Sequence, residues 1–514
     1  MAAFLAIILV MLLTPFLLTA FAGAEGSGSG ADSGAGSGAD EQLAAWPNLV
    51  LEDGSFNVTF LSEAGEWFES HFALRSNLLQ LDQSLRGVFG ATTSEKVIAG
   101  DNGWLYYSGT LGDFEGTAPM TDRQLQSIAY NLSLAQGYIQ AQDATFTVTI
   151  APNKNTIYPE NMPSRFVETC AEHNVERLST YLTNAGVNYL DLLGPLKEAR
   201  TNSDTSLYYA KDSHWNEIGA SVGFDALMSG IGLAHRTFGT SDFTWVDSDT
   251  GDLNVMINPA GGVTESVPVL ARVRGFAFLR DVDDVEEPIL ETVSVTDEAK
   301  TNGTLLMYRD SFGNNLIPYM AEAFSRAYFT KYTPYDLTLV SSTGARHVII
   351  ERAERNLYSF ASNPPIMPAP STTVVTTATL ESSTTVSGAA DGSLWKIQGW
   401  FQGVDMDVNS PIYVAIQPLG SADGAVSLGS ADGAGSLGSA DGAGLSYVAF
   451  RTEALAGSTD TASDASAGES VDLGTSGFML HVPQEDFPSG SYRVSVVVSV
   501  NSKLVRVAQT MVVL

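Results

Sequence analysis

Apolar and polar positions follow two alternating rhythms along residues 45–358. A helical spacing of three, four and seven residues begins after Asp122, which can cap the helix, and the β-rich run ATFTVTIA follows at 144–151. Further helices are predicted at 172–185, after Asn216 and at 314–326, and further strands at 187–192, 304–308, 327–330 and 347–351. Strands that alternate with helices are typical of βαβ units. We therefore expect an α/β fold with a mainly parallel sheet covered on both faces.

The pattern changes in two places. Residues 236–300 break the alternation, and we expect an insertion there over one end of the sheet. Residues 361–392 are rich in Pro and then in Ser and Thr, which is typical of an interdomain linker. Six short β-rich runs follow, at 394–401, 412–418, 447–450, 478–483, 492–500 and 503–513. They predict a small all-β sandwich over residues 393–514.

Two kinds of segment stand outside this folded pattern. Residues 2–22 carry no charge, so 1–24 are expected to be a signal peptide or a membrane anchor, and the Gly/Ser/Ala-rich residues 25–44 a linker. The motif GSADGA recurs at Gly420, Gly429 and Gly438. Because this unit has no hydrophobic face, it is expected to be a disordered loop expansion within the β-sandwich.

Charge and composition narrow the classes of partner. The chain holds 26 Lys and Arg against 58 Asp and Glu, a net charge of −32. This balance argues against nucleic acid as a partner, because phosphate binding requires clustered basic residues. The chain has one cysteine, Cys170, and its six histidines form no HxxxH or HxH pair. We therefore expect no disulfide framework and no tightly bound transition metal, whereas sites made of carboxylates alone remain open.

The first candidate for chemistry is the segment DSHWN at 212–216, between a strand-like LYYA and a predicted helix. An aspartate two residues before a histidine can place its carboxylate against the imidazole. That contact would fix the tautomer and stabilise the imidazolium during proton transfer. The alternative is a surface loop in which Asn216 caps the following helix.

The second candidate is RDSFG at 309–313, directly after the predicted strand 304–308. A serine on a sharp turn from strand to helix exposes its hydroxyl, and the first N–H groups of the helix point toward the same space. Ser311 could thus be a nucleophile, with an oxyanion site at the N–H of Phe312. The alternative is that Asp310 or Ser311 only caps the helix. The two motifs support each other, because an Asp–His pair needs a nucleophile.

Asn153 and Lys154 are weaker candidates. They follow the strand 144–151 at the sheet edge that also carries the two loops. They could contact substrate or an oxyanion there, and the alternative is a simple turn.

Six blocks of sequence carry a resemblance to a known family. They are FESHFALRSNLL (68–79), VIAGDNGWLYY (97–107), APNKNTIYPENMP (151–163), DSHWN (212–216), GDLNVMI (251–257) and RDSFGNNLIPYMAEAF (309–324). In this order they resemble the SGNH-hydrolase-like domain of the alginate O-acetyltransferase type, which includes AlgJ, AlgX and the related DHHW proteins. The resemblance implies an SGNH-like three-layer domain over residues 45–360, with the β-sandwich as an accessory domain.

The resemblance also implies a catalytic triad. Ser311 would be the nucleophile, His214 the base and Asp212 the residue that orients it. The Asp–His pair precedes the serine, which is the reverse of ordinary SGNH esterases. Arg309 precedes Asp310 as in the DHHW branch, but that branch has a second histidine where this chain has Ser213.

The function that follows from the resemblance is an extracytoplasmic O-acetyltransferase. It would transfer acetyl groups to hydroxyls of a cell-surface polysaccharide through an acyl-serine intermediate, with no cofactor required. A membrane-bound O-acyltransferase is implied as the acyl-donor partner, and the N-terminal segment would associate the protein with the membrane. The alternatives are a carbohydrate esterase with the same triad and a non-catalytic surface protein that binds glycan.

Overall fold

A computed structural model of the chain describes most of the two folded regions. The described residues are 56–57, 59–60, 94–258, 263–271, 275–280, 288–297, 299–374, 376, 378–380, 382–407, 410–419, 446–452 and 475–514. The expected signal or anchor, the linker at 25–44, the block at 68–79 and the GSADGA repeats lie outside them. No helix among the described residues has the length and apolar character needed to cross a membrane.

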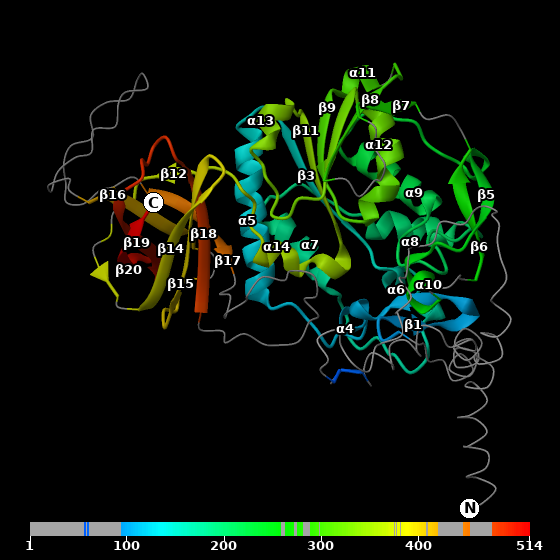
Figure 1. The fold of residues 1–514 in the computed structure, drawn as a ribbon, viewed down its shortest axis with the longest axis horizontal. Helices are drawn as coiled ribbons and strands as arrows, with labels where there is room; N and C mark the ends of the chain where they lie inside the picture. Colours follow the sequence, from blue (N-terminus) through cyan, green and yellow to red (C-terminus); the bar gives the residue numbers. More distant parts are fainter. Residues whose placement is uncertain are drawn as a thin grey trace, which may run out of the picture. The chain divides into compact units, whose positions relative to one another are not determined.

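The described part of the α/β region is built on a seven-stranded sheet with the order β4-β3-β11-β9-β10-β8-β7 (Figure 1). The strands are β3 (Thr145–Ala151), β4 (Tyr189–Leu190), β7 (Phe276–Phe278), β8 (Ile289–Ser294), β9 (Thr304–Tyr308), β10 (Arg326–Thr330) and β11 (His347–Ala353). The first five strands in this order pair in parallel, and β8 and β7 add antiparallel pairs at one edge. The expectation of a mainly parallel sheet is confirmed.

Helices cover both faces of this sheet. They include α5 (Asp122–Gln140), α7 (Asn174–Asn184), α8 (Leu193–Thr201), α9 (Glu217–Gly230), α12 (Ile317–Ala323), α13 (Leu339–Thr343) and α14 (Tyr358–Ser362). Helix α5 packs against β3, α7 and α14, whereas α9 packs against α8 and α12. Figure 1 shows α5 and α14 on one face of the sheet and α9 and α12 on the other. The cap of α5 is Thr121 and not Asp122, because the Thr121 side chain and Gln124 form a reciprocal capping box.

The helix expected at 314–326 begins and ends differently. A short 3-10 helix, η5 (Phe312–Leu316), comes first, and α12 follows with Pro318 in its first turn. Proline fits that turn because the N–H groups of the first turn of a helix have no acceptor within the helix, so the N–H that proline lacks is not needed. Helix α12 ends before Phe324, since the chain turns there into strand β10.

The segment expected to be an insertion has two parts. Strands β5 (Phe243–Ser248) and β6 (Glu265–Leu270) form a separate antiparallel hairpin, and the short helix α10 (Asp252–Ile257) lies between them in sequence. Strands β7 and β8, in contrast, extend the central sheet. The expectation that all of 236–300 lies over one end of the sheet is therefore wrong for its second half.

The all-β region expected at the C-terminus is confirmed. Its strands are β12 (Ser371–Thr372), β13 (Ala378–Thr379), β14 (Ser383–Asp391), β15 (Leu394–Gln402), β16 (Ile412–Pro418), β17 (Ser446–Thr452), β18 (Thr475–Pro483), β19 (Ser491–Val500) and β20 (Lys503–Val513). They form one nine-stranded sheet that curls around a core containing Ile397, Val414 and Phe478. The stretch 361–392 is not only a linker, because β12, β13 and β14 lie in it and pair within this sheet.

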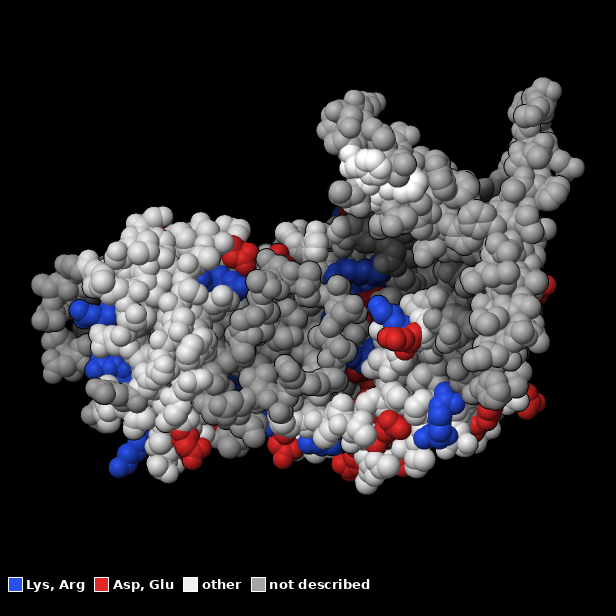
Figure 2. All heavy atoms as spheres, turned by 60° about the horizontal axis from the view of Figure 1, so that its bottom comes forward, with Lys and Arg blue, Asp and Glu red and all other residues white. Residues whose placement is uncertain are grey.

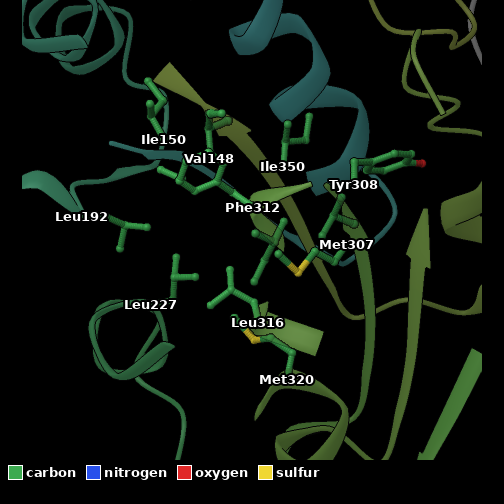
Figure 3. Packing of buried hydrophobic residues seen from close by; sticks show 14 of the residues in the cluster. Val148, Ile150, Leu192, Leu227, Met307, Tyr308, Phe312, Leu316, Met320 and Ile350 are labelled. Atoms are coloured by element: carbon green, nitrogen blue, oxygen red, sulfur yellow. The ribbon is translucent and has the colours of Figure 1, made fainter. Parts of the chain in front are cut away.

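The core of the α/β region lies where the central strands meet the helices. Val148 of β3, Met307 of β9 and Ile350 of β11 are fully buried, and Figure 3 shows them close to Phe312 and Leu316. Strands buried on both faces read as continuous apolar runs, as in LLMY of β9. Strand β3 instead alternates threonine with apolar residues, and its buried Thr149 hydroxyl donates to the Leu190 carbonyl at 2.8 Å. Because Phe312 and Leu316 belong to this core, the core extends to the turn that follows β9, where Ser311 lies.

On the face in Figure 2, charged side chains of the described residues are scattered singly or in small mixed groups among uncharged surface.

Candidate active site

Ser311 lies at the carboxyl end of strand β9, at the first position before η5. The central strand and the buried Phe312 hold this turn in place, while Ser311 itself is partly exposed. The Asp310 carboxylate stabilises the turn, because it accepts hydrogen bonds from the backbone N–H of Phe312 at 3.0 Å and from that of Ala353 at 2.8 Å. The serine hydroxyl is thus presented on a rigid turn at the sheet edge.

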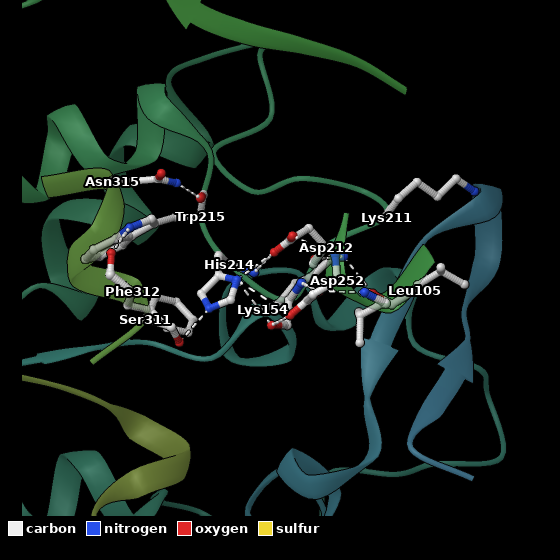
Figure 4. Close-up of polar contacts among 12 residues, drawn as sticks. Leu105, Lys154, Lys211, Asp212, His214, Trp215, Asp252, Ser311, Phe312 and Asn315 are labelled. Carbon is white, nitrogen blue, oxygen red and sulfur yellow. Dashed lines mark hydrogen bonds and ion pairs between the residues drawn. The ribbon is translucent and has the colours of Figure 1, made fainter. Parts of the chain in front are cut away.

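His214 joins the two other members of the expected triad. Its Nε2 is 2.8 Å from Ser311 Oγ, and its Nδ1 is 2.6 Å from Asp212 Oδ1 (Figure 4). A carboxylate can only accept, so Nδ1–H donates to Asp212 and Nε2 is left to accept the serine proton. The structure brings together all three residues that the sequence motifs indicated.

Asp212 is held as a carboxylate by several donors. Its Oδ1 also accepts the His214 backbone N–H at 2.9 Å, and its Oδ2 accepts the Asp252 backbone N–H at 2.9 Å. Burial raises the pKa of Asp212, but the hydrogen bonds and the charge of His214 outweigh burial and hold this pKa below its usual range. Asp212 therefore stays ionised and can stabilise an imidazolium.

The loops before α9 and after β9 are tied together by Trp215. Its indole Nε1–H donates to the Phe312 carbonyl at 3.0 Å, and its own carbonyl accepts from Asn315 Nδ2 at 2.8 Å (Figure 4). Asn216 caps α9 through a 3.0 Å bond from the Gly219 N–H. The segment 212–216 is thus both a helix cap and the carrier of the histidine.

The N–H of Phe312 does not have the free position that an oxyanion site requires. It donates to Asp310 Oδ1 at 3.0 Å, and the Phe312 side chain is fully buried, 4.8 Å from the His214 ring between centroids. The expected oxyanion role of Phe312 is therefore corrected, because the Asp310 side chain folds back onto this N–H. Phe312 instead forms the apolar floor beneath the histidine.

Asn153 and Lys154 support the site from within the protein. The Lys154 ammonium donates to the carbonyls of Leu105 at 2.6 Å, Ala210 at 2.9 Å and Asp212 at 2.9 Å, and burial lowers the pKa of Lys154 to about 7. Asn153 is 1% exposed, and its backbone N–H donates to Glu354 at 2.7 Å. Neither residue lines the pocket described next, so their placement does not support direct contact with substrate.

An open pocket of about 310 Å³ contains the triad. Its lining residues are Tyr209, Asp212, His214, Ser248, Thr250, Gly251, Glu265, Val267, Ser311, Asn314 and Asn315. Ser248, Glu265 and Val267 come from the β5–β6 hairpin, so the first half of the expected insertion forms one wall of the site. Most of these lining side chains carry a hydroxyl, amide or carboxylate group, which suits a polar, hydroxyl-bearing ligand.

Asp212, His214 and Asp252 are the described residues whose arrangement could offer ligand atoms to a metal, since these atoms lie within 4.8 Å of one another. The atoms are already used in hydrogen bonds: Nδ1 of His214 with Asp212, and the Asp252 carboxylate with Ser213. This set therefore fits a hydrogen-bonded proton-transfer site better than a metal centre.

Sequence reasoning missed two acidic residues of the site. Asp252 lies within the block GDLNVMI, which contributes to the family resemblance but carries no pattern that indicates a functional residue. Glu265 accepts the N–H groups of Ala210 at 2.5 Å and Lys211 at 2.7 Å and so shapes the loop before His214. No local pattern around Glu265 indicates this role.

Comparison with known proteins bears on this site. Residues 97–274 match the family model described as "SGNH hydrolase-like domain, acetyltransferase AlgX". The resemblance expected from the sequence is confirmed. Asp212 and His214 lie inside the matched part of this SGNH-like domain, and Ser311 lies beyond it.

Two relatives named "Probable alginate O-acetylase AlgJ" are similar to part of the chain. The protein from Azotobacter vinelandii is 26% identical over 162 residues, which cover 30% of this chain and 39% of that protein. The protein from Pseudomonas syringae pv. tomato is 28% identical over 138 residues, which cover 26% of this chain and 33% of that protein. The chain thus spans well under half the length of these relatives. Among solved structures, PatB1 from Bacillus cereus is 17% identical, with a TM-score of 0.38 over 51% of this chain and 96% of that one.

Proposed function

We propose that this chain is a serine-dependent O-acetyltransferase that acetylates hydroxyl groups of a cell-surface polysaccharide. The observation that carries the proposal is the pair of hydrogen bonds from Ser311 Oγ to His214 Nε2, 2.8 Å, and from His214 Nδ1 to Asp212 Oδ1, 2.6 Å. The names of the AlgJ relatives support acetyl as the transferred group.

The first half of the reaction forms an acetyl-serine. As Ser311 Oγ bonds to the acetyl carbonyl carbon, its proton passes to His214 Nε2. Asp212 stabilises the imidazolium through the bond to Nδ1. The bond between the acetyl carbon and the donor oxygen then breaks, and His214 returns the proton to that oxygen.

The second half transfers the acetyl group to the acceptor. A sugar hydroxyl in the pocket gives its proton to His214 Nε2 while its oxygen bonds to the acetyl carbon, and Ser311 leaves and regains the proton. Water would take the same path and yield acetate. Transfer therefore requires the pocket to hold the hydroxyl in an attacking position ahead of water.

The proposal includes a location and a partner. The uncharged segment at 2–22 supports export or anchoring outside the cytoplasm, where acetyl-CoA is absent. A membrane-bound O-acyltransferase would then deliver the acetyl group to Ser311.

The test is to follow a labelled acetyl group on the purified chain. With a chromogenic acetyl ester as donor, we expect a burst of leaving group and one acetyl group on Ser311 by mass spectrometry. Ser311→Ala has no hydroxyl to acetylate at this position, and its release of the leaving group should fall by on the order of 10⁴-fold. Ser362→Ala removes an exposed serine hydroxyl at the end of α14. This variant is the matched control, and its Ser311 should be acetylated as in the wild type.

Acceptors then separate the alternatives. An O-deacetylated oligosaccharide should speed loss of label from Ser311 and carry the label itself. If all label appears as free acetate at a rate that no glycan changes, the protein is an esterase. If Ser311 is never acylated, a glycan-binding role replaces both enzymatic ones.

A further inference from the structure

A second carboxylate faces the same edge of the His214 ring as Asp212. Asp252 opens helix α10, and its Oδ2 is 3.6 Å from His214 Nδ1, against 2.6 Å for Asp212 Oδ1. Figure 4 shows both carboxylates on the side of the ring opposite Ser311. An imidazolium at His214 would therefore meet two negative charges at once.

The Asp252 carboxylate is fixed in this position. Its Oδ2 accepts the Ser213 hydroxyl at 2.5 Å, and its Oδ1 accepts the backbone N–H of Ser213 at 2.7 Å and of Leu253 at 2.6 Å. Ser213 is itself 4% exposed, so the donor side of this contact is buried. Oδ1 and Oδ2 are thus both anchored, and the distance to His214 is set by the fold.

Asp252 also holds the first carboxylate. Its backbone N–H donates to Asp212 Oδ2 at 2.9 Å, so α10 begins with an N–H directed at the triad. The side chains of Asp212 and His214 are 19% and 18% exposed, and that of Asp252 is 32% exposed. At this burial, water and ions only partly screen the interaction between Asp252 and the ring.

We propose that Asp252, held by Ser213, is a positioning residue for the acyl transfer: its carboxylate acts with Asp212 to stabilise the His214 imidazolium that forms when Ser311 loses its proton. The inference rests on the proposed function and deepens it. It also gives a role to Ser213, which stands where the DHHW branch has a second histidine. The effect is confined to the charged transition state, so it changes the rate of acylation and not the binding of the donor.

Asp252→Asn tests the charge with the shape retained. The Asn oxygen can still accept the two backbone N–H groups, and the Ser213 hydroxyl can turn to accept from the new amide. We expect the maximal rate of Ser311 acylation by the chromogenic ester to fall about 10- to 100-fold with an unchanged KM. Asp143→Asn, which removes an exposed carboxylate from the turn between α5 and β3, is the matched control and should keep the wild-type rate.

Ser213→Ala provides a second measurement that retains the Asp252 carboxylate and its charge. It removes the hydroxyl that anchors Oδ2, and we expect a smaller fall, several-fold, again without a change in KM. If Asp252→Asn fails to fold, this variant and Asp252→Glu decide the matter. Partial recovery of the maximal rate in Asp252→Glu supports the charge, and a wild-type rate in Ser213→Ala overturns the proposal.

Two other outcomes overturn the inference. One is a wild-type rate in folded Asp252→Asn. The other is a fall in rate matched by a rise in KM, which would indicate a distorted pocket. Both differ from failure of the proposed function, in which the wild-type chain itself is never acylated at Ser311.

Discussion

The indole Nε1–H of Trp215 donates a 3.0 Å hydrogen bond to the backbone carbonyl of Phe312. Trp215 follows His214 in sequence and Phe312 follows Ser311, so this buried bond joins the immediate neighbours of the proposed base and the proposed nucleophile. The 2.8 Å contact between His214 and Ser311 is thus backed by a second contact between their loops.

Trp215→Phe should weaken this connection. The Phe312 carbonyl would lose its partner, and we expect the free energy of unfolding to fall by about 1–3 kcal/mol. The acylation rate should fall about tenfold, because reacting groups lose their alignment. Urea unfolding and burst kinetics measure the two effects.

Trp395→Phe is the matched control for that experiment. Trp395 Nε1 donates to the Phe487 carbonyl at 2.7 Å within the all-β region. We expect a similar loss of stability with an unchanged rate of acylation. Equal losses of activity in the two variants would contradict a local role for Trp215.

Asp212→Asn should remove the charge that supports the His214 imidazolium. An Asn amide can also donate to Nδ1 and so favour the wrong tautomer, and we expect acylation to fall by on the order of 10²- to 10⁴-fold. Asp225→Asn offers the same change at another pair, since Asp225 Oδ1 lies 2.9 Å from His235 Nε2 on the far part of α9. Activity should survive there; a comparable loss would show that the effect is not specific to the triad.

Two glycines should respond in opposite ways to alanine. A Cβ at Gly313 would lie 2.6 Å from Arg309 Cβ and 2.8 Å from Glu351 Oε2, so the turn after Ser311 must shift. We expect Gly313→Ala to lower the free energy of unfolding by about 1–3 kcal/mol and to slow acylation of Ser311. A Cβ at Gly137 in α5 meets nothing within 4 Å, so Gly137→Ala should stabilise the protein by about 0.5–1 kcal/mol. Thermal unfolding of both variants checks the contrast, and a stabilising Gly313→Ala would refute the tight packing at this turn.

Lys154 makes stability depend on pH. Burial lowers its pKa from the ordinary 10.5 to about 7, so between these values the unfolded chain binds the proton more strongly than the folded one. Raising the pH through this range removes the penalty of a buried ammonium. We expect the stability of the wild type relative to Lys154→Met to rise by about 1.4 kcal/mol per pH unit there.

Lys197→Met is the control for this pH series, because the Lys197 side chain is 47% exposed on α8. The stability of Lys197→Met should change with pH in the same way as that of the wild type. Parallel curves for the wild type and Lys154→Met would show that the protein does not release this proton on folding.

The sequence predicted much of this arrangement because the relevant signals are local. The strand 304–308 and the motif around Ser311 lie within a few residues of each other, and a parallel sheet brings the loops after its strands to one edge. The convergence of Asp212, His214 and Ser311 follows from that rule together with the resemblance.

What escaped prediction depends on contacts between distant segments or on side chains folding back. Asp252 reaches Asp212 across 40 residues of a segment without a periodic pattern. The turn after a strand predicts a free Phe312 N–H, and only the conformation of the Asp310 carboxylate shows that this N–H is bonded. The position of Lys154 directly after a strand suggests an exposed side chain. Its ammonium is instead buried and donates hydrogen bonds to three backbone carbonyls.

The β5–β6 hairpin has a consequence for how such a protein can diversify. Ser248 and Val267 line the pocket from a two-stranded element that is separate from the central sheet, whereas Ser311 and His214 are held by that sheet and by α9. Substitutions or changes of length in the hairpin would alter this wall of the pocket and leave Ser311 and His214 in place. Glu265 is the exception, since its carboxylate binds the loop before His214. Under the proposed function, the hairpin is therefore the element in which acceptor preference can change while Ser311 and His214 keep their positions.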